Sequence, residues 1–270
     1  MGTFTGKTVV VTGSSRGIGR ETALAFAESG ATVVLHGRDA AALEEVASML
    51  VARTSATVRS VAGDIADTAT AERLRDTAEA LGGCDVLINN AGASMRGRFA
   101  EISPAVFKAV MRTNLVGASI VTQTLLPMII AARGSIVFMS SVSGMRGFPG
   151  ISIYSAAKMG LTALSESLRA ELAHDGVHIG IIYAGYTEND AQKSVFGPDG
   201  RPIRVHRPYD MTQRDLAAAV VHTVVKRRNE VTLTAKGKLL RACNRLAPGL
   251  TREIIRRSGG RFHQMSDDAR

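Results

Sequence analysis

Short runs of β-branched residues alternate with amphipathic stretches that are long enough to form helices. The runs, each of which we expect to be a strand, are Lys7–Thr12, Ala31–His36, Ala56–Ala62, Asp85–Asn89, Ser135–Ser140 and His178–Tyr183. Strict strand–helix alternation predicts parallel strands joined by right-handed crossovers. Runs such as VVV and VLI are apolar on both faces, as in a sheet covered on both sides. We therefore expect an α/β chain: a single doubly wound domain with a parallel sheet of about seven strands and helices on both faces, with ligands bound at the carboxyl ends of the strands.

Helices are predicted between these strands from apolar periodicity and capping residues. Their expected spans are Ile18–Ser29, Asp39 to Arg53, Thr68 to Leu81, Ser103 to Ala132 and Tyr154–His174, with Asp39, Thr68 and Ser103 as N-caps. The most apolar stretch, from Leu115 to Ala132, contains several polar residues and a proline, so it favours a buried helix over a membrane span.

The positive charge of the chain is concentrated near its C-terminus. Residues Lys226 to Arg261 hold eleven Lys or Arg against two Glu, and the other residues hold twenty-two of each sign. Nucleic-acid-binding proteins usually spread basic charge over a face of the fold and add aromatic residues. Aromatic residues are 4% here and Trp is absent, so we expect no nucleic-acid partner.

The cysteines and the N-terminus suggest an ordinary reduced cellular protein. Cys84 and Cys243 lie outside any CxxC or CxxH pattern, so no disulfide and no metal site are expected. The first residues lack the apolar core of a signal peptide. We expect a cytoplasmic location.

A glycine-rich turn, Thr12-Gly13-Ser14-Ser15-Arg16-Gly17-Ile18-Gly19, follows the first strand and opens the first helix. Such a turn lets the backbone approach a pyrophosphate, and the helix N-terminus supplies unpaired N–H groups and the positive end of its dipole. Glycine triplets alone are a weak signal, but this position after a first strand strengthens it. The expected cofactor contacts here are Gly13, Ser15, Arg16, Gly17, Ile18 and Gly19.

Four further elements occur in order along the chain. Asn89-Asn90-Ala91-Gly92 ends the fourth strand, Asn114 lies in Arg-Thr-Asn-Leu-Val-Gly, Ser141 precedes Tyr154 by thirteen residues, and Tyr154-Ser-Ala-Ala-Lys158 forms a YxxxK sequence. Together with the TGxxxGxG turn they resemble the short-chain dehydrogenase/reductase family, in its branch of about 250 residues. The resemblance extends to about Leu233. It implies a Rossmann fold and a homodimer or homotetramer that packs helices equivalent to 104–132 and 154–174.

The resemblance also implies the roles of individual residues. Asn114, Ser141, Tyr154 and Lys158 are the expected catalytic residues, and Lys158 also holds the nicotinamide ribose. Further implied cofactor contacts are Asp64 and Ile65 at the adenine, Asn90, Ala91 and Gly92 after the fourth strand, and Tyr154.

The chemistry of Tyr154 and Lys158 follows from their spacing. Residues four apart share one helix face. A phenol with its usual pKa near 10 is a poor base at neutral pH, and a neighbouring ammonium lowers that pKa. Such a tyrosine donates a proton to a carbonyl oxygen as hydride arrives, or accepts it in reverse. Ser141 is expected to hydrogen-bond the same oxygen, and Asn114 to support a water that links Lys158 to solvent. Taken singly, each could be an ordinary surface or capping residue; only their joint spacing argues for catalysis.

The cofactor is expected to be NADP(H). NAD-binding folds place an acidic residue at the end of the second strand, whereas Gly37 and then Arg38 stand there. Arg38 and Arg16 suit a 2′-phosphate through charge-assisted, bidentate contacts. The alternative is that Asp39 accepts the ribose, but we expect Asp39 to cap the following helix.

One departure from the family follows the sixth strand. The family usually has Pro-Gly there, and this chain has Ala184-Gly185. Gly185 and Thr187 remain expected contacts of the nicotinamide end of the cofactor. Residues 188–212, rich in Gly, Pro and Arg, are expected to form a substrate loop of a catalytic domain that spans residues 1–235.

Residues 236–270 form a basic C-terminal extension, expected to be helical and then disordered. Leu239, Cys243, Leu246, Leu250 and Ile254 recur near a helical period, with arginines on another side, and Pro248-Gly249 divides the segment into two short helices. Apolar and basic faces suit an anionic membrane surface. The alternative is a lid or subunit contact with solvated arginines.

The sequence therefore predicts an NADP(H)-dependent oxidoreductase that interconverts a small-molecule ketone or aldehyde and an alcohol. One rival is a nucleotide-sugar epimerase or dehydratase, disfavoured by the glycine spacing and the short C-terminal part. The other is a catalytically idle NADP-binding protein that acts at a membrane surface. The substrate, the physiological direction and the choice between dimer and tetramer stay open.

Overall fold

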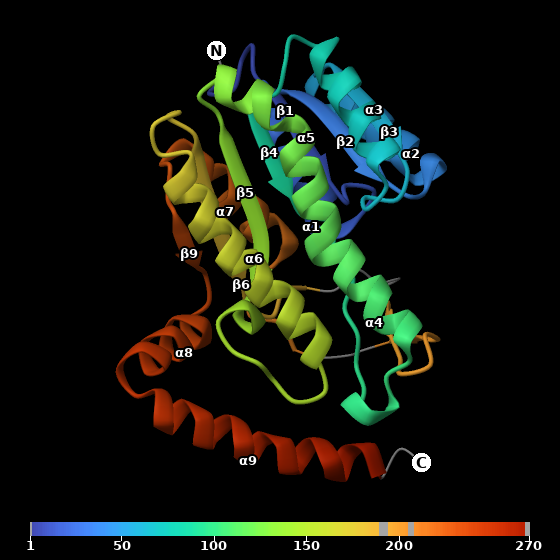
Figure 1. Cartoon of the computed structure of the whole chain (residues 1–270). Coiled ribbons are helices and arrows are strands. Elements are labelled where there is room, and N and C mark those ends of the chain that lie inside the picture. Colours follow the sequence, from blue (N-terminus) through green and yellow to red (C-terminus); the bar gives the residue numbers. More distant parts are fainter. Residues whose placement is uncertain (1, 189–193, 205–207, 268–270) are drawn as a thin grey trace.

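A computed structural model describes residues 2–188, 194–204 and 208–267 (Figure 1). Its central sheet has seven parallel strands in the order β3-β2-β1-β4-β5-β6-β9. Their bounds are β1 Thr8–Thr12, β2 Thr32–Gly37, β3 Val58–Ala62, β4 Val86–Asn89, β5 Ser135–Ser141, β6 His178–Ala184 and β9 Glu230–Thr232. The doubly wound sheet of about seven strands is thus confirmed, and its order reverses between β1 and β4, where ligands of such sheets bind.

Helices cover both faces of the sheet, as predicted. The helices of the described chain are α1 Gly17–Glu28, α2 Ala40–Thr54, α3 Thr68–Glu79, α4 Pro104–Met111, α5 Gly117–Ala131, α6 Ser152–Glu171, α7 Gln213–Val225, α8 Ala235–Leu246 and α9 Pro248–Asp267. The last two, α8 and α9, lie beyond the end of the sheet and not on either face (Figure 1). Val9 and Val11 of β1 share a buried cluster with residues of α1, α2 and α7. Val10 points the other way and joins a cluster with α3, α5 and α6. Because successive side chains enter cores on opposite faces, runs such as Val9–Val11 are apolar at every position.

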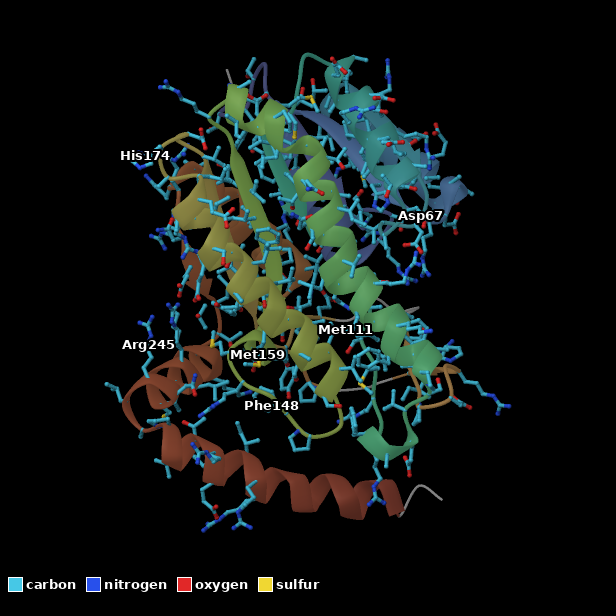
Figure 2. All side chains as sticks on the ribbon, viewed as in Figure 1. Asp67, Met111, Phe148, Met159, His174 and Arg245 are labelled. Carbon is cyan, nitrogen blue, oxygen red and sulfur yellow. The ribbon has the colours of Figure 1, made fainter. Side chains whose placement is uncertain are left out.

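Most predicted caps are confirmed. Asp39 accepts a hydrogen bond from the Ala42 amide at the start of α2, and Ser103 accepts one from Val106 at the start of α4. The prediction for Thr68 was wrong, because Thr68 is the first residue of α3 and Asp67 is in the cap position without a capping bond. The Asp67 carboxylate, labelled in Figure 2, instead pairs with Arg112 at 3.2 Å.

The helix predicted from Ser103 to Ala132 is present but contains a π-helical segment, Arg112–Val116, between α4 and α5. By length and composition alone, Pro104–Ala131 could cross a membrane, and it is the one such helix among the described residues. In the structure Val121, Leu125 and Ile129 are buried. They pack α5 onto the sheet, in front of it in Figure 1.

The C-terminal third differs from the prediction in two features. The expected substrate loop contains an antiparallel hairpin, β7 Ser194–Phe196 and β8 Pro202–Arg204; residues 189–193 and 205–207 of this loop lie outside the described residues. The extension does divide at Pro248, but its second helix is long rather than short. The helix is described to Asp267, and the expected disordered end stays a prediction.

Candidate active site

A cavity of about 540 Å³ lies at the carboxyl ends of the strands, beside the point where the strand order reverses. Twelve of the predicted cofactor contacts line it: Gly13, Ser15, Arg16, Gly17, Ile18, Gly19, Arg38, Asp64, Ile65, Asn90, Ala91 and Gly92. Gly37, Tyr154, Lys158, Gly185 and Thr187 are not among its described lining residues. The cavity is therefore built mainly from the glycine turn and the ends of β2 and β4.

The glycine turn leaves the start of α1 open to a ligand. Gly13 has φ +65°, and a Cβ at Gly19 would lie 2.1 Å from the Gly13 carbonyl oxygen, so no side chain fits at Gly19 without moving the turn. Arg16 occupies the cap position in extended conformation, and its side chain makes no capping bond. The first N–H groups of α1 are thus left for a ligand, as at phosphate-binding helix starts.

Asn90 holds the glycine turn against β4. Its side-chain amide donates to the carbonyl oxygens of Thr12 and Gly13 at 2.9 and 3.0 Å. The Thr12 hydroxyl accepts from the backbone N–H groups of Asn90 and Ala91. Asn90 therefore fixes the turn, and Thr12, which sequence analysis did not assign to the site, is the other half of this contact.

Arg16 and Arg38 both line the cavity as exposed side chains. No carboxylate within the described residues forms an ion pair with either. Gly37 faces the turn, because a Cβ there would lie 3.2 Å from the Ser15 hydroxyl. The end of β2 thus offers cations and no acidic side chain, since Asp39 caps α2.

Asp64 and Ile65 form the wall that follows β3. Asp64 accepts from the Ala66 amide and lies 3.5 Å from the Arg112 guanidinium. Ile65 is 4% exposed and packs against Gly117 at the start of α5, where a Cβ would lie 2.6 Å from its side chain. Asp64 is therefore held by a residue that itself lines the cavity, and Ile65 by its packing on α5.

Tyr154 and Lys158 lie one turn apart on α6. Lys158 is 5% exposed, and its ammonium lies 5.7 Å from the centre of the Tyr154 ring. The same ammonium donates to the Met139 carbonyl oxygen of β5 at 2.8 Å. A lysine this deeply buried is uncommon without a polar partner, and here the sheet supplies one.

Asn114 lies in the π-helical segment and is completely buried. Its amide nitrogen donates to the carbonyl oxygens of Ala93 and Val110. Its Oδ1 has no partner within the described residues. A Cβ at Gly92 would lie 2.9 Å from that oxygen and 3.5 Å from the Lys158 ammonium, so these three residues meet. π-Helical turns of this kind are frequent at functional sites.

Ser141 and Ala184 are the last paired residues of β5 and β6. A proline at 184 would lack the N–H group that a strand donates. The Ser141 hydroxyl accepts from the Ser143 amide at 3.2 Å, so it caps the short 3₁₀ turn Val142–Gly144. The capping role is the alternative that the sequence left open for Ser141. A capping bond to the oxygen leaves the hydroxyl hydrogen able to contact a substrate.

Gly185 and Thr187 begin the segment after β6. A Cβ at Gly185 would lie 2.5 Å from the Thr234 side chain, so glycine is needed here for contact with the start of α8. Thr187 is 6% exposed, and its hydroxyl donates to the Gly185 carbonyl oxygen at 3.4 Å. Contact with a cofactor remains a prediction for both residues.

His36, which lines the cavity at the end of β2, was not predicted from the sequence. It is 2% exposed, and its Nδ1 accepts from the Gly13 amide at 3.4 Å. Burial lowers the pKa of the imidazole to about 4, so it is neutral at physiological pH. A histidine at a strand end facing a glycine turn was the available signal. Ser94, Lys108, Arg112 and Phe196 also line the cavity and were not predicted.

His36 is expected to make folding sensitive to mild acid. Because its pKa of about 4 in the folded protein lies below the usual 6.5, the unfolded chain binds more protons between these values. The stabilisation is complete above pH 6.5 and declines as pH falls towards 4. Protonation of His36 on unfolding is expected to lower the unfolding free energy of the wild type by about 2–3 kcal/mol between pH 7.5 and 4.5. We expect His36→Gln to lack this part of the decrease, measured by urea denaturation at both pH values.

The exposed His174, at the edge of the molecule in Figure 2, provides the matched control. His174→Gln makes the same histidine-to-glutamine change at an exposed position and shows the effect of the substitution outside the buried site. An equal slope in wild type and His36→Gln would show that His36 is not protonated on unfolding.

The comparison with known proteins agrees with this geometry. The family model described as short chain dehydrogenase matches residues 7–199. Dehydrogenase/reductase SDR family member 7B of Bos taurus is 36% identical over 258 residues, which cover 90% of this chain and 78% of that protein. Ketoacyl reductase HetN of Nostoc is 33% identical over 264 residues, covering 95% of this chain and 90% of that protein.

Solved structures show the same fold. The L-sorbose reductase of Gluconobacter frateurii, complexed with NADPH and L-sorbose, has a TM-score of 0.74 at 22% identity and covers 85% of this chain and 95% of its own. A putative short-chain alcohol dehydrogenase of Sinorhizobium meliloti has a TM-score of 0.67 at 31% identity, with 70% and 76% covered.

Proposed function

The chain belongs to the short-chain dehydrogenase family of oxidoreductases, and we propose that it interconverts a ketone or aldehyde and an alcohol with NADP(H) as its cofactor. The observation that carries this proposal is the meeting of Gly92, Asn114 and Lys158 beside Tyr154, next to a cavity lined by the glycine turn. The L-sorbose reductase and the alcohol dehydrogenase of Thermococcus sibiricus were solved with NADPH and 5-hydroxy-NADP respectively.

The residues present fit a dinucleotide phosphate. The uncapped start of α1 and the side-chain-free surface at Gly19 form a cradle for a pyrophosphate. Arg16 and Arg38 would hold the 2′-phosphate. When bound, the nicotinamide supplies or accepts the hydride; the protein supplies position and a proton.

Tyr154 would move that proton. Its hydroxyl would donate to the substrate oxygen during reduction and accept from it during oxidation. The buried Lys158 ammonium, 5.7 Å from the ring centre, stabilises negative charge on the phenol oxygen. The Ser141 hydroxyl would hydrogen-bond the same substrate oxygen as charge develops there.

Asn114 would hold a water through which Tyr154 regains its proton from solvent. Its unpartnered Oδ1, close to the Lys158 ammonium, is an acceptor for a water between the two side chains. The two bonds from its amide nitrogen fix the orientation of that oxygen. A relay from solvent through water and Lys158 to Tyr154 follows.

The surroundings of Tyr154 favour an apolar substrate. Met95, Val106, Val110 and Ile153 form a separate buried cluster, against which Tyr154 and Phe196 pack. An apolar wall beside the proton donor retains carbonyl compounds with a hydrocarbon body and excludes water.

We also propose a homodimer or homotetramer that buries the outer surfaces of α4, α5 and α6. Phe107, Val116 and Met159 on this surface are exposed by 46%, 42% and 44%. Met111 and Met159 lie on neighbouring helices there (Figure 2). Aligned apolar side chains on adjacent helices are typical of a subunit contact.

The direct test is oxidation of NADPH, followed by its absorbance, across a panel of carbonyl compounds that range from short sugars to long-chain and cyclic ketones. We expect turnover with NADPH, greater for the apolar members, and much less with NADH. Binding of NADPH without turnover of any compound, in both directions, would favour the idle cofactor-binding alternative.

A further inference from the structure

The C-terminal extension carries an exposed apolar surface. Among the described side chains, every Leu or Ile that is more than half exposed lies there: Leu239 at 65%, Leu246 at 86%, Leu250 at 57% and Ile254 at 56%. Leu239 and Leu246 are seven residues apart on α8, and Leu250 and Ile254 are four apart on α9, so each pair shares a helix face. We call these four residues the apolar corner, because they flank the bend between the two helices. An apolar group of this kind marks an interaction surface.

Basic side chains surround the apolar corner. Residues 235–257 contain seven Lys or Arg and a single Glu. That glutamate, Glu253, is already paired with Arg256 and Arg257. Lys238, Arg245 and Arg252 are exposed and make no ion pair within the described part of the chain. Figure 2 shows Arg245 projecting outward from α8.

The other side of α8 is attached to the catalytic domain. Gly237 packs against Val142, and Asn244 donates to the Met145 carbonyl oxygen at 3.4 Å. The Arg146 guanidinium donates to the Pro248 carbonyl oxygen at 3.3 Å. These contacts hold the bend close to the segment that follows Ser141, a predicted catalytic residue. Phe148, on the loop that leads into α6, lies between α6 and α9 in Figure 2.

We propose that the apolar corner docks the protein on an anionic lipid surface. Leucines and isoleucine would enter the boundary between head groups and acyl chains, and the unpaired cations would lie among the anionic head groups. A second copy of this chain is a poorer occupant, because a two-fold interface would place the same basic surface against itself. Docking in this way turns the segment that follows Ser141 towards the bilayer.

Vesicle flotation of the full chain tests this proposal. We expect binding to vesicles in which about one lipid in four is phosphatidylserine and little binding to pure phosphatidylcholine. Leu246→Ser/Leu250→Ser and Arg245→Gln/Arg252→Gln are each expected to weaken binding at least about tenfold. Raising NaCl to about 0.5 M is expected to weaken wild-type binding, since it screens the charges.

A control variant makes one comparable change of each kind elsewhere on the surface. Val225→Ser/Lys226→Gln removes an exposed apolar and basic pair at the end of α7 and is expected to bind vesicles like wild type. Equal binding to neutral and anionic vesicles, absence of binding, or undiminished binding by the corner variants would overturn the proposal. So would an oligomer that Leu246→Ser/Leu250→Ser dissociates without any vesicle binding. NADPH affinity, measured on every variant, reports separately on the proposed enzyme function.

Discussion

Replacement of Tyr154 by Phe is expected to lower kcat by about 10²–10⁴-fold while NADPH affinity changes little. The variant keeps the ring that packs against the buried cluster of Met95, Val106, Val110 and Ile153, and it keeps Lys158 bonded to the Met139 carbonyl. It loses only the oxygen that would transfer a proton. Stopped assays with the best carbonyl substrate and fluorescence titration with NADPH measure the two quantities.

Tyr183→Phe is the matched control for Tyr154→Phe. The Tyr183 hydroxyl contacts Thr162 at 3.4 Å and has no role in the proposed chemistry. This variant is expected to retain most of the wild-type kcat. Turnover by Tyr154→Phe at the level of Tyr183→Phe would rule out Tyr154 as the proton donor and with it the proposed roles of Lys158 and Asn114.

The fold could be predicted from the sequence where the residues of an element are enough by themselves to identify it. Five of the six predicted strands are mostly apolar and buried along almost their whole length, so each can be recognised without its neighbours. Strand β3 is the exception, because Arg59 and Ser60 are exposed. Strand β9 was not predicted, because only three residues pair with Ile181–Tyr183 and their burial depends on β6. The hairpin β7–β8 is equally short. Such elements are defined by what they pair with, and local composition does not reveal them.

The candidate site could be predicted where a motif fixes the residue type at a given position. The glycine turn is visible from its own pattern after the first strand, and Asn90 and the Tyr154–Lys158 pair follow from the family resemblance. Their roles in binding and catalysis stay predictions. His36 was missed because its role depends on Gly13, which approaches it only in three dimensions. The contact of Gly185 with Thr234 likewise joins two distant segments. The ion pair between Asp67, in the cap position of α3, and Arg112 also joins residues that are distant in the sequence.

Arg38→Asp is expected to reverse the cofactor preference. A charge-assisted contact to a 2′-phosphate contributes about 1.5–3 kcal/mol, so its loss raises the Kd for NADPH by roughly 10–150-fold. The new carboxylate repels the phosphate and can accept from the 2′-hydroxyl of NADH, as acidic residues at the end of this strand do. Position 38 suits this test better than Gly37, where a Cβ would be crowded by Ser15. The ratio of kcat/KM values for the two cofactors is the measurement.

The effect of the changed net charge must be separated from the effect of its position beside the cavity. Lys226→Asp alters the net charge of the protein equally, at an exposed site on the loop after α7, and is expected to keep the NADPH preference. Arg16→Gln is expected to weaken NADPH binding without improving NADH, because it removes one cation and adds no acceptor for the ribose. If Arg38→Asp and Lys226→Asp weaken NADPH binding to the same extent, the effect comes from the general field of the protein. If Lys226→Asp keeps the preference for NADPH and Arg38→Asp loses it, the 2′-phosphate binds at the end of β2, next to the glycine turn.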